Sequence, residues 1–105
     1  MLKGGMGNFL KQARQMQENV AKLQEEAAFR TVEASAGGGM INVTANGAGD
    51  ILSVKIEKQV VDPEDVEMLE DLVRAACNEA SRKGREMMAE EMKKLTGGLN
   101  IPGLF

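Results

Sequence analysis

The longest uninterrupted pattern in this chain lies between Pro63 and Pro102, the two prolines of the sequence. Asp62 is a residue type that caps helix N-termini, and Pro63 suits the first helical position, where its missing N–H costs nothing. At the other end, Gly97-Gly98 can adopt the left-handed conformation that commonly closes a helix. The sequence therefore predicts one long helix from Pro63 to Thr96.

This helix constrains the fold because it is too long to be covered by its own chain. At about 1.5 Å per residue it would be roughly 45–50 Å long. A compact chain of this size has a radius of gyration of only about 13 Å. Part of the helix must therefore project or be covered by a second copy. We expect a passage from fold to arm near Met87 and Met88, where the apolar register shifts.

The proximal part of the helix has one apolar face, which we expect to pack on the chain's own sheet. Three of its members are small, which predicts the close approach of another backbone. The face consists of Val66, Leu69, Val73, Ala76, Ala80, Gly84 and Met87. The distal part carries a shifted face, Met88, Met92 and Leu95, which we expect to serve a different contact, such as a second copy.

A second helix is predicted near the N-terminus. Residues 1–7 are rich in glycine and are expected to form a flexible tail, and Asn8 can cap a helix that runs to about Ala28. Six apolar residues in this helix recur at spacings of three and four: Phe9, Ala13, Met16, Val20, Leu23 and Ala27. Such a heptad-like seam fits either packing within the fold or an intermolecular coiled coil.

Between the helices the apolar period changes to two, which predicts strands. The alternating sets are Val32, Ala34 and Ala36, then Ile41, Val43 and Ala45, then Leu52, Val54 and Ile56. Gly37–Gly39 and Asn46–Asp50 are predicted turns, and Asn-Gly is a strong hairpin signal. We expect a three-stranded antiparallel meander with one apolar face.

Together these elements predict one α+β domain over residues 1–105, with the order helix, three-stranded antiparallel sheet, long helix (α-β-β-β-α). Residues 98–105 are expected to form a second flexible tail. A three-stranded sheet has open edges and a marginal core. We therefore expect a homodimer, intertwined or paired through sheet edges, with projecting helices.

The residues that usually carry catalysis or bind metals are scarce. The chain has no histidine, and Cys77, its one cysteine, falls beside an apolar helix stripe, where a buried small hydrophobe is expected. The glycine clusters lack the Lys-Ser/Thr of a phosphate-binding loop, and the acidic run 62–71 lacks the spacing of a calcium-binding loop. We expect no enzyme activity, cofactor, metal site or small-molecule substrate.

The chain also carries no sign of a membrane or secretory destination. No apolar run approaches the roughly 18 residues that a membrane span needs. The N-terminal residues lack the long apolar core of a signal peptide. A single cysteine suits a reducing compartment. We expect a cytoplasmic protein without a membrane partner.

The net charge is −3, but seven of the 16 acidic residues lie in the segment 57–71. Nine basic residues on the two helices are candidate DNA contacts: Lys11, Arg14, Lys22, Arg74, Arg82, Lys83, Arg85, Lys93 and Lys94. Cations without interleaved aromatic residues suit phosphates better than base edges or single strands. The alternative is a solvated helix surface with ion pairs such as Glu79–Lys83 and Glu90–Lys94. Of the two helices, the basic side of the long one, Arg74 to Lys94, is the preferred candidate.

Several stretches, in this order and spacing, resemble the YbaB/EbfC family of small bacterial nucleoid-associated proteins. They are Gly7–Glu18, Leu23–Glu26, Val43–Gly47, Val54–Ile56, Met68–Ala80 and Lys94–Leu99. The resemblance implies a homodimer with projecting helical arms that binds double-stranded DNA and alters its conformation. It also implies roles in nucleoid organisation and gene expression.

The family has no sharply defined DNA-contact motif to carry over, so the nine basic residues above remain the candidate contacts. The alternative function is a protein-interaction adaptor without direct DNA binding. It would use the Met88 and Met92 end of the long helix and the tail 101–105.

Overall fold

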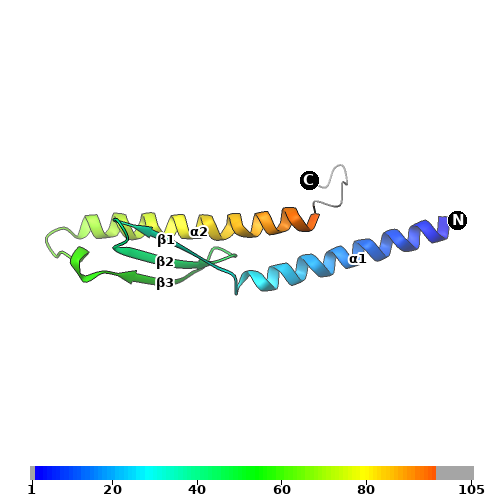
Figure 1. The fold of residues 1–105 in the computed structure, drawn as a ribbon, viewed down its shortest axis with the longest axis horizontal. Coiled ribbons are helices and arrows are strands. Elements are labelled where there is room, and N and C mark those ends of the chain that lie inside the picture. Colours follow the sequence, from blue (N-terminus) through cyan, green and yellow to red (C-terminus); the bar gives the residue numbers. More distant parts are fainter. Residues whose placement is uncertain (1, 97–105) are drawn as a thin grey trace.

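The computed structural model describes residues 2–96 of the chain, and the side chains of residues 7–95. The elements are α1 (Leu2–Ala27), β1 (Thr31–Ala36), β2 (Ile41–Asn46), β3 (Ile51–Ile56), the 3₁₀ turn η1 (Lys58–Val60) and α2 (Val66–Thr96). This order, shown in Figure 1, confirms the α-β-β-β-α prediction. The molecule is elongated, measuring 76 × 23 × 16 Å with a radius of gyration of 20.4 Å.

The three strands form an antiparallel sheet in the order β1-β2-β3, as predicted. In register, Val43 of β2 lies between Ala34 of β1 and Val54 of β3. The ladder is irregular at one place: Thr44 pairs with Ser53, but Ala45 pairs with Ile51. The alternation of apolar residues places Leu52 on the same face as Val54 and Ile56. In the structure, however, Ile51 rather than Leu52 is the partner of Ala45.

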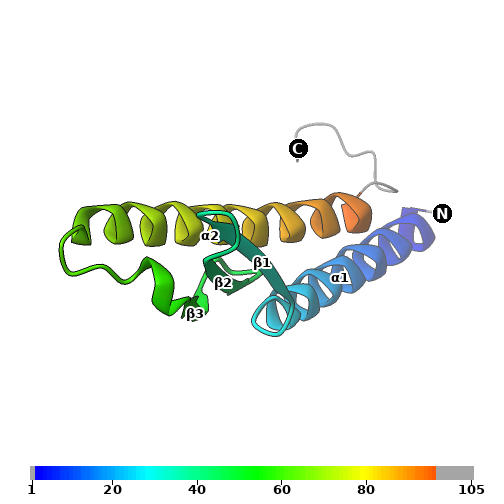
Figure 2. The same ribbon diagram turned by 60° about the vertical axis from the view of Figure 1, so that its left-hand side comes forward.

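One face of the sheet is covered by α2, which lies over β1 and β2 in both views of the ribbon (Figures 1 and 2). Ile41 and Val43 are the largest side chains that are fully buried, and Ala76 and Ala80 of α2 have no exposed surface. Small side chains let a helix backbone lie close to a sheet. The proximal apolar face of α2 therefore packs on the chain's own sheet as predicted, except that Val66 is 50% exposed.

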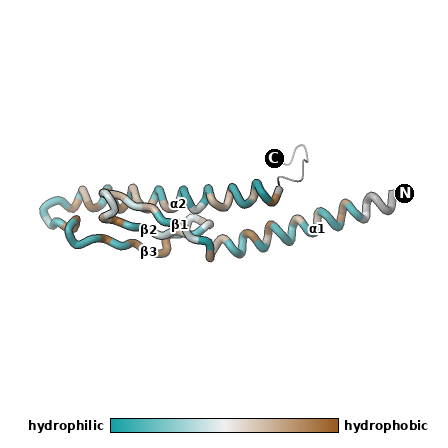
Figure 3. Tube along the Cα trace, in the orientation of Figure 1, coloured by the Kyte–Doolittle hydropathy of each residue, from teal (hydrophilic) through white to brown (hydrophobic). Residues whose placement is uncertain are grey.

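The apolar residues of β3 lie outside the cover that α2 provides. Every residue of this edge strand is exposed. Four apolar side chains keep much of their surface in solvent: Ile51 (39%), Leu52 (51%), Val54 (40%) and Ile56 (41%). Figure 3 shows hydrophobic segments along β3, at the border of the sheet. The strand therefore presents a partly exposed apolar surface at one edge of the sheet.

The start of α2 differs from the prediction. The helix begins at Val66 rather than at Pro63, and its cap is Asp65, whose Oδ1 accepts a hydrogen bond from the N–H of Met68 at 3.2 Å. Asp62 instead closes a separate turn, because its Oδ1 accepts from the N–H of Glu64. Asp62 and Asp65 are both suitable N-cap residues, and the predicted helix start was too early because it used Asp62. The helix ends at Thr96 as predicted; the exit expected at residues 97–98 lies outside the described residues.

The first helix also starts earlier than predicted, at Leu2, so the start predicted at Asn8 is wrong. Glycine in a helix costs about 1 kcal/mol relative to alanine, which disfavours a helix without forbidding it. The seam on α1 is used only in part: Leu23 and Ala27 are buried, whereas Phe9 is 62% exposed. The seam packs within the fold over the C-terminal half of α1 and is open over the N-terminal half.

The projecting element is the N-terminal half of α1, not the distal half of α2. In Figures 1 and 2 the C-terminal half of α1 runs beside the distal part of α2, and the rest of α1 continues past the end of α2. Met88, expected to serve another contact, lies against Gly47 of the same chain. The boundary between the packed fold and the projecting arm therefore lies within α1, and not near Met87 and Met88 of α2 as predicted. The C-terminal end of α1 leads directly into the sheet, so this end of the helix is held in the fold.

Candidate nucleic-acid interface

The nine basic candidates fall into two groups, one on each helix, and the two groups have different surroundings. Lys11, Arg14 and Lys22 lie on α1, and the other six lie on α2. The structure does not gather all nine on one surface. It places the α1 group on the side of the projecting helix that faces away from the seam.

The α1 group forms an exposed stripe that Glu18 interrupts between Arg14 and Lys22. At 100° per residue its three members fall within about 80° of one another, opposite the seam that α2 covers in part. The first and last, Lys11 and Lys22, are about 16 Å apart along the helix axis. In the part of the chain that the structure describes, no ion pair joins any of the three to an acid, although Glu18 lies in the same stripe.

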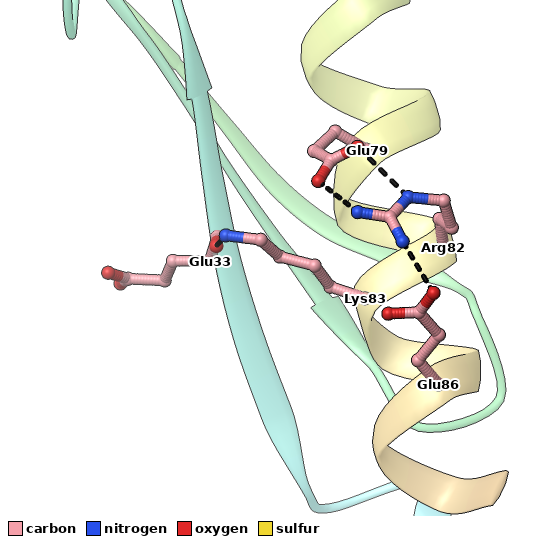
Figure 4. Close-up of polar contacts among 5 residues, drawn as sticks. All are labelled: Glu33, Glu79, Arg82, Lys83 and Glu86. Atoms are coloured by element: carbon pink, nitrogen blue, oxygen red, sulfur yellow. Dashed lines mark hydrogen bonds and ion pairs between the residues drawn. The ribbon is translucent and has the colours of Figure 1, made fainter.

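Arg82 of α2 is held by two acids of its own helix. Its guanidinium donates to the carboxylate of Glu79, one turn before it, and to the carboxylate of Glu86, one turn after it (Figure 4). The hydrogen bond from Arg82 lowers the pKa of Glu79 below its ordinary value, and the same bond and charges raise the pKa of Arg82. The charge of Arg82 is therefore balanced before any ligand arrives.

Lys83 has a different role, at the edge of the sheet. Its Nζ donates to the backbone carbonyl oxygen of Glu33 on β1 at 3.1 Å (Figure 4). A lysine beside an edge strand blunts that edge against pairing with another chain. The ion pair between Glu79 and Lys83 suggested by their spacing is not formed, since Glu79 binds Arg82 instead.

The remaining α2 cations are also close to groups of their own chain. Arg74 pairs with Asp71 at 3.1 Å, and Lys94 lies 3.7 Å from Glu91 rather than beside Glu90. Arg85 lies against Gly49 in the turn between β2 and β3. Lys93 is exposed in the last turn of the helix. The basic side of α2 is thus mostly engaged within the chain.

Sequence spacing alone could not have separated the two groups. Acids stand three or four residues from most of the α2 cations, which signals helical ion pairs. Glu18, however, also stands four residues after Arg14, and that pair is not formed. The distinction depends on side-chain conformations that the spacing does not fix.

Charge is also divided along the long axis of the molecule. The segment 33–71 carries two basic and nine acidic residues, a net charge of −7. The segments 2–32 and 72–96 together carry eleven basic and seven acidic residues, a net charge of +4. In Figure 1 the loop between β3 and α2, which carries several of these acids, lies at the opposite end from the N-terminus of α1. The projecting helix is therefore the end that favours an anionic partner.

Other chemistry has little support in the described residues. Cys77 is a free, half-buried thiol on α2. Within residues 2–96 no three His, Cys, Asp or Glu side chains are grouped in a way that could hold a metal ion. The same part of the chain has no helix long and apolar enough to span a bilayer.

Comparison with known proteins finds a matching family and similar relatives. The family described as the YbaB/EbfC DNA-binding family matches residues 3–99. A nucleoid-associated protein of Syntrophobacter fumaroxidans is 58% identical over 92% of this chain and 88% of its own length. Nucleoid-associated proteins of Thermoanaerobacter pseudethanolicus and Pelotomaculum thermopropionicum are 56% and 50% identical over the full length of both chains.

The fold has a solved counterpart. The crystal structure of an uncharacterized protein from Helicobacter pylori superposes with a TM-score of 0.61, covering 90% of this chain and 91% of that one. The two sequences are 24% identical, so the likeness concerns the fold alone. It supports the arrangement of two helices and a three-stranded sheet described above.

Proposed function

The chain belongs to the YbaB/EbfC DNA-binding family, and on that premise we propose that it binds double-stranded DNA as a homodimer, chiefly through backbone phosphates, and alters the conformation of the DNA. It would act in the nucleoid of the bacterial cytoplasm, organising DNA and influencing gene expression. It would need no cofactor and no small-molecule substrate.

The observation that carries this proposal is the exposed basic stripe of α1, Lys11, Arg14 and Lys22. Cations already paired with acids contribute little to phosphate binding, because their own partners must first be displaced. The α1 stripe has no such partner among the described residues, and it lies on a helix that projects from the fold. A stripe about 16 Å long spans roughly five phosphate intervals of one DNA strand.

The homodimer is proposed from the apolar surface of β3. This edge strand leaves Ile51, Leu52, Val54 and Ile56 between 39% and 51% exposed. Exposed apolar edges are aggregation hazards unless a partner covers them. The opposite edge, β1, is guarded by Lys83. A second copy that packs its own β3 surface here would complete both cores and give the assembly two α1 arms.

Two arms would explain how contacts to phosphates alone could change DNA conformation. Each arm would hold phosphates at a separate place on the duplex, and the acidic ends of the protomers would stay away from it. Holding two separated points of one duplex restrains the path of the DNA between them.

The direct test is a titration of a fluorescently labelled duplex at two salt concentrations. Phosphate contact predicts that log K falls with log salt by about 0.9 for each phosphate neutralised. Binding that weakens steeply between about 50 and 200 mM salt is the expected result. No binding even at the lower concentration would overturn the proposal.

The homodimer has its own test in Val54→Asp, which places a charge on the exposed apolar strand. Light scattering should give twice the chain mass of 11.3 kDa for the parent and one chain mass for the variant. Ser53→Asp is the matched control, since it adds the same charge to the neighbouring residue on the other face of β3. A parent that stays monomeric, or a Val54→Asp variant that stays dimeric, would contradict the assignment of the interface.

A second candidate function is a protein-interaction adaptor without direct DNA binding. The observation that favours it is the exposure of two large apolar residues on the projecting arm, Phe9 (62%) and Leu10 (61%). The tail 101–105, which the sequence assigns to such an adaptor, lies outside the described residues. Deletion of residues 97–105 tests the tail: an adaptor that uses it would lose partner capture, whereas DNA affinity would be unchanged. Phe9→Ala with Leu10→Ala tests the exposed residues of the arm by the same two readouts.

A further inference from the structure

The turn between β2 and β3, residues 46–50, lies where α1, the sheet and α2 meet. The N–H of Gly47 is shared between two carbonyl oxygens at the base of the arm, Ala27 at 2.9 Å and Arg30 at 3.0 Å. These acceptors belong to the last residue of α1 and to the link that follows it. The turn is therefore tied by its backbone to the point from which the arm departs.

The side chain of Asn46 completes this connection. It is 3% exposed, and its Oδ1 accepts hydrogen bonds from the N–H groups of Ala48 at 3.0 Å and Asp50 at 2.9 Å. Its Nδ2 donates to the carbonyl oxygen of Ala28 at 3.5 Å and to Asp50 Oδ2 at 3.4 Å. One buried amide thus shapes the turn and holds it against the end of α1.

The distal part of α2 also contacts the turn 46–50 and the base of α1. Four of its residues lie against the turn or the base of α1, and they recur at spacings of three and four, on one helix face: Ser81, Gly84, Met88 and Glu91. Ser81 Oγ donates to the carbonyl oxygen of Gly49 at 2.8 Å. Glu91 pairs at 3.3 Å with Arg30, which also holds Glu26 of α1.

Gly84 makes the tightest of these approaches. A Cβ built on this residue would overlap the backbone carbonyl oxygen of Asn46. Backbone atoms cannot rotate away as a side chain can, so a larger residue must push α2 and the turn apart. The close approach predicted from the small residues of α2 is thus the approach of α2 to this turn.

We propose that Asn46 and Gly84 are positioning residues that fix the direction of the α1 arm relative to the sheet and α2. The arm then presents its basic stripe to DNA already oriented, which saves the entropy of ordering a hinged helix. Small changes in the direction of α1 are amplified along its length, because Lys11 lies about 24 Å from Ala27 along the helix. We call the place where the turn 46–50, the end of α1 and the distal part of α2 meet the joint. A rotation of about 10° at the joint would move Lys11 by roughly 4 Å, more than the length of a hydrogen bond.

The DNA-binding part of this inference rests on the proposed function, so the test has two readouts. The first is the distance distribution between spin labels at Gln12→Cys on α1 and Asn78→Cys on α2, in a Cys77→Ala background. Labelled chain is diluted with unlabelled chain so that one pair is measured. The second readout is DNA affinity by titration of a labelled duplex.

The joint is changed in three ways. Gly84→Ala adds a methyl group at the contact with the Asn46 backbone, and Asn46→Ala removes the side-chain amide that shapes the turn. The double variant Ser81→Ala with Glu91→Ala removes two side-chain interactions without adding bulk, in case the other two variants do not fold. Gly7→Ala is the matched control, because it is also a helical glycine, on the arm, and a Cβ there meets nothing within 4 Å.

We expect one narrow distance in the parent and in Gly7→Ala. We expect a distribution at least about twofold broader, or displaced by several ångströms, in the joint variants, with DNA affinity about tenfold weaker. Folded joint variants that keep the parent's distances would overturn the inference alone. Altered distances with unchanged affinity would also overturn it, because the joint would then be structural only. A parent that binds no DNA would overturn the proposed function and the positioning role together.

Discussion

The two helices of this chain both carry exposed basic residues, but they differ in how far the chain itself engages those charges. On α2, Arg74, Arg82 and Lys94 are paired with acids of the same helix, and Lys83 binds a backbone carbonyl oxygen. On α1 the stripe of Lys11, Arg14 and Lys22 has no acid bound to it in the described residues. On the proposed function, we therefore expect the affinity of each helix for phosphate to depend on whether its charges are already engaged, rather than on the number of its basic residues.

The same two helices differ in how they are packed. The middle of α2 is pressed against the sheet through Ala76, Ala80 and Gly84, which are buried. The N-terminal half of α1 continues beyond the other elements. One helix stabilises the fold and the other extends from it. Changes to α2 should therefore act first on stability, and changes to the projecting part of α1 should act on binding.

The largest expected effect is on DNA affinity when charge is reversed on each helix in turn. Lys11→Glu with Arg14→Glu should weaken binding by at least about a hundredfold at roughly 0.1 M salt, since each phosphate interaction contributes roughly tenfold there. Arg74→Glu with Lys94→Glu changes the net charge equally but alters residues that are already paired. That pair should cost only a few-fold in a duplex titration. Equal losses of affinity would remove the distinction between the helices.

A smaller effect, on stability, separates the crowded helix from the open one. Gly84→Ala should lower the free energy of unfolding by about 2–3 kcal/mol, because the new methyl group meets the Asn46 backbone. Gly7→Ala should raise it by up to about 1 kcal/mol, since alanine favours helix and the site is open. Urea unfolding followed by circular dichroism measures both. A Gly84→Ala variant as stable as the parent would show that the joint is loose.

The smallest expected effect concerns the ion pairs of Arg82. The pKa of Glu79 is lowered by Arg82, so the pair contributes stability above the ordinary glutamate pKa of 4.5 and loses it as the pH falls below that value. Arg82→Gln should raise the pKa of Glu79 in an NMR titration and change DNA affinity less than about twofold. Because both side chains are about half exposed, salt should weaken the effect. An unchanged pKa in Arg82→Gln would show that the pair does not form in solution.

Much of the fold could be predicted from the sequence because its periodicities are strong. The change from spacings of three and four to a spacing of two located all three strands, and the small residues of α2 correctly indicated a close backbone approach. The residues at which the helices begin were harder to predict. Asp62 and Asp65 are equally good caps by residue type, and only the observed hydrogen bonds choose Asp65.

Which of the nine candidate cations are engaged within the chain could not be predicted from the sequence, for a physical reason. The sequence favoured the basic side of α2 because it has more cations over a longer helix. Which cations are engaged depends on tertiary interactions, such as that of Lys83 with β1, and on which of several neighbouring acids a side chain meets. The joint could not be foreseen either, because Asn46 and Gly84 are far apart in sequence and meet only when α2 lies on the sheet.

The measurement that tests the central claim most directly is the salt dependence of DNA binding by two charge-matched triple variants. One carries Lys11→Ala, Arg14→Ala and Lys22→Ala on α1; the other carries Arg74→Ala, Arg82→Ala and Lys94→Ala on α2. If the α1 stripe neutralises phosphates in both protomers, the slope of log K against log salt should become shallower by about 0.9 for each phosphate no longer neutralised, hence by about 5 in the α1 variant. The α2 variant should keep the parent's slope to within about 1. A slope that is unchanged in the α1 variant, or reduced equally in both, would contradict this account.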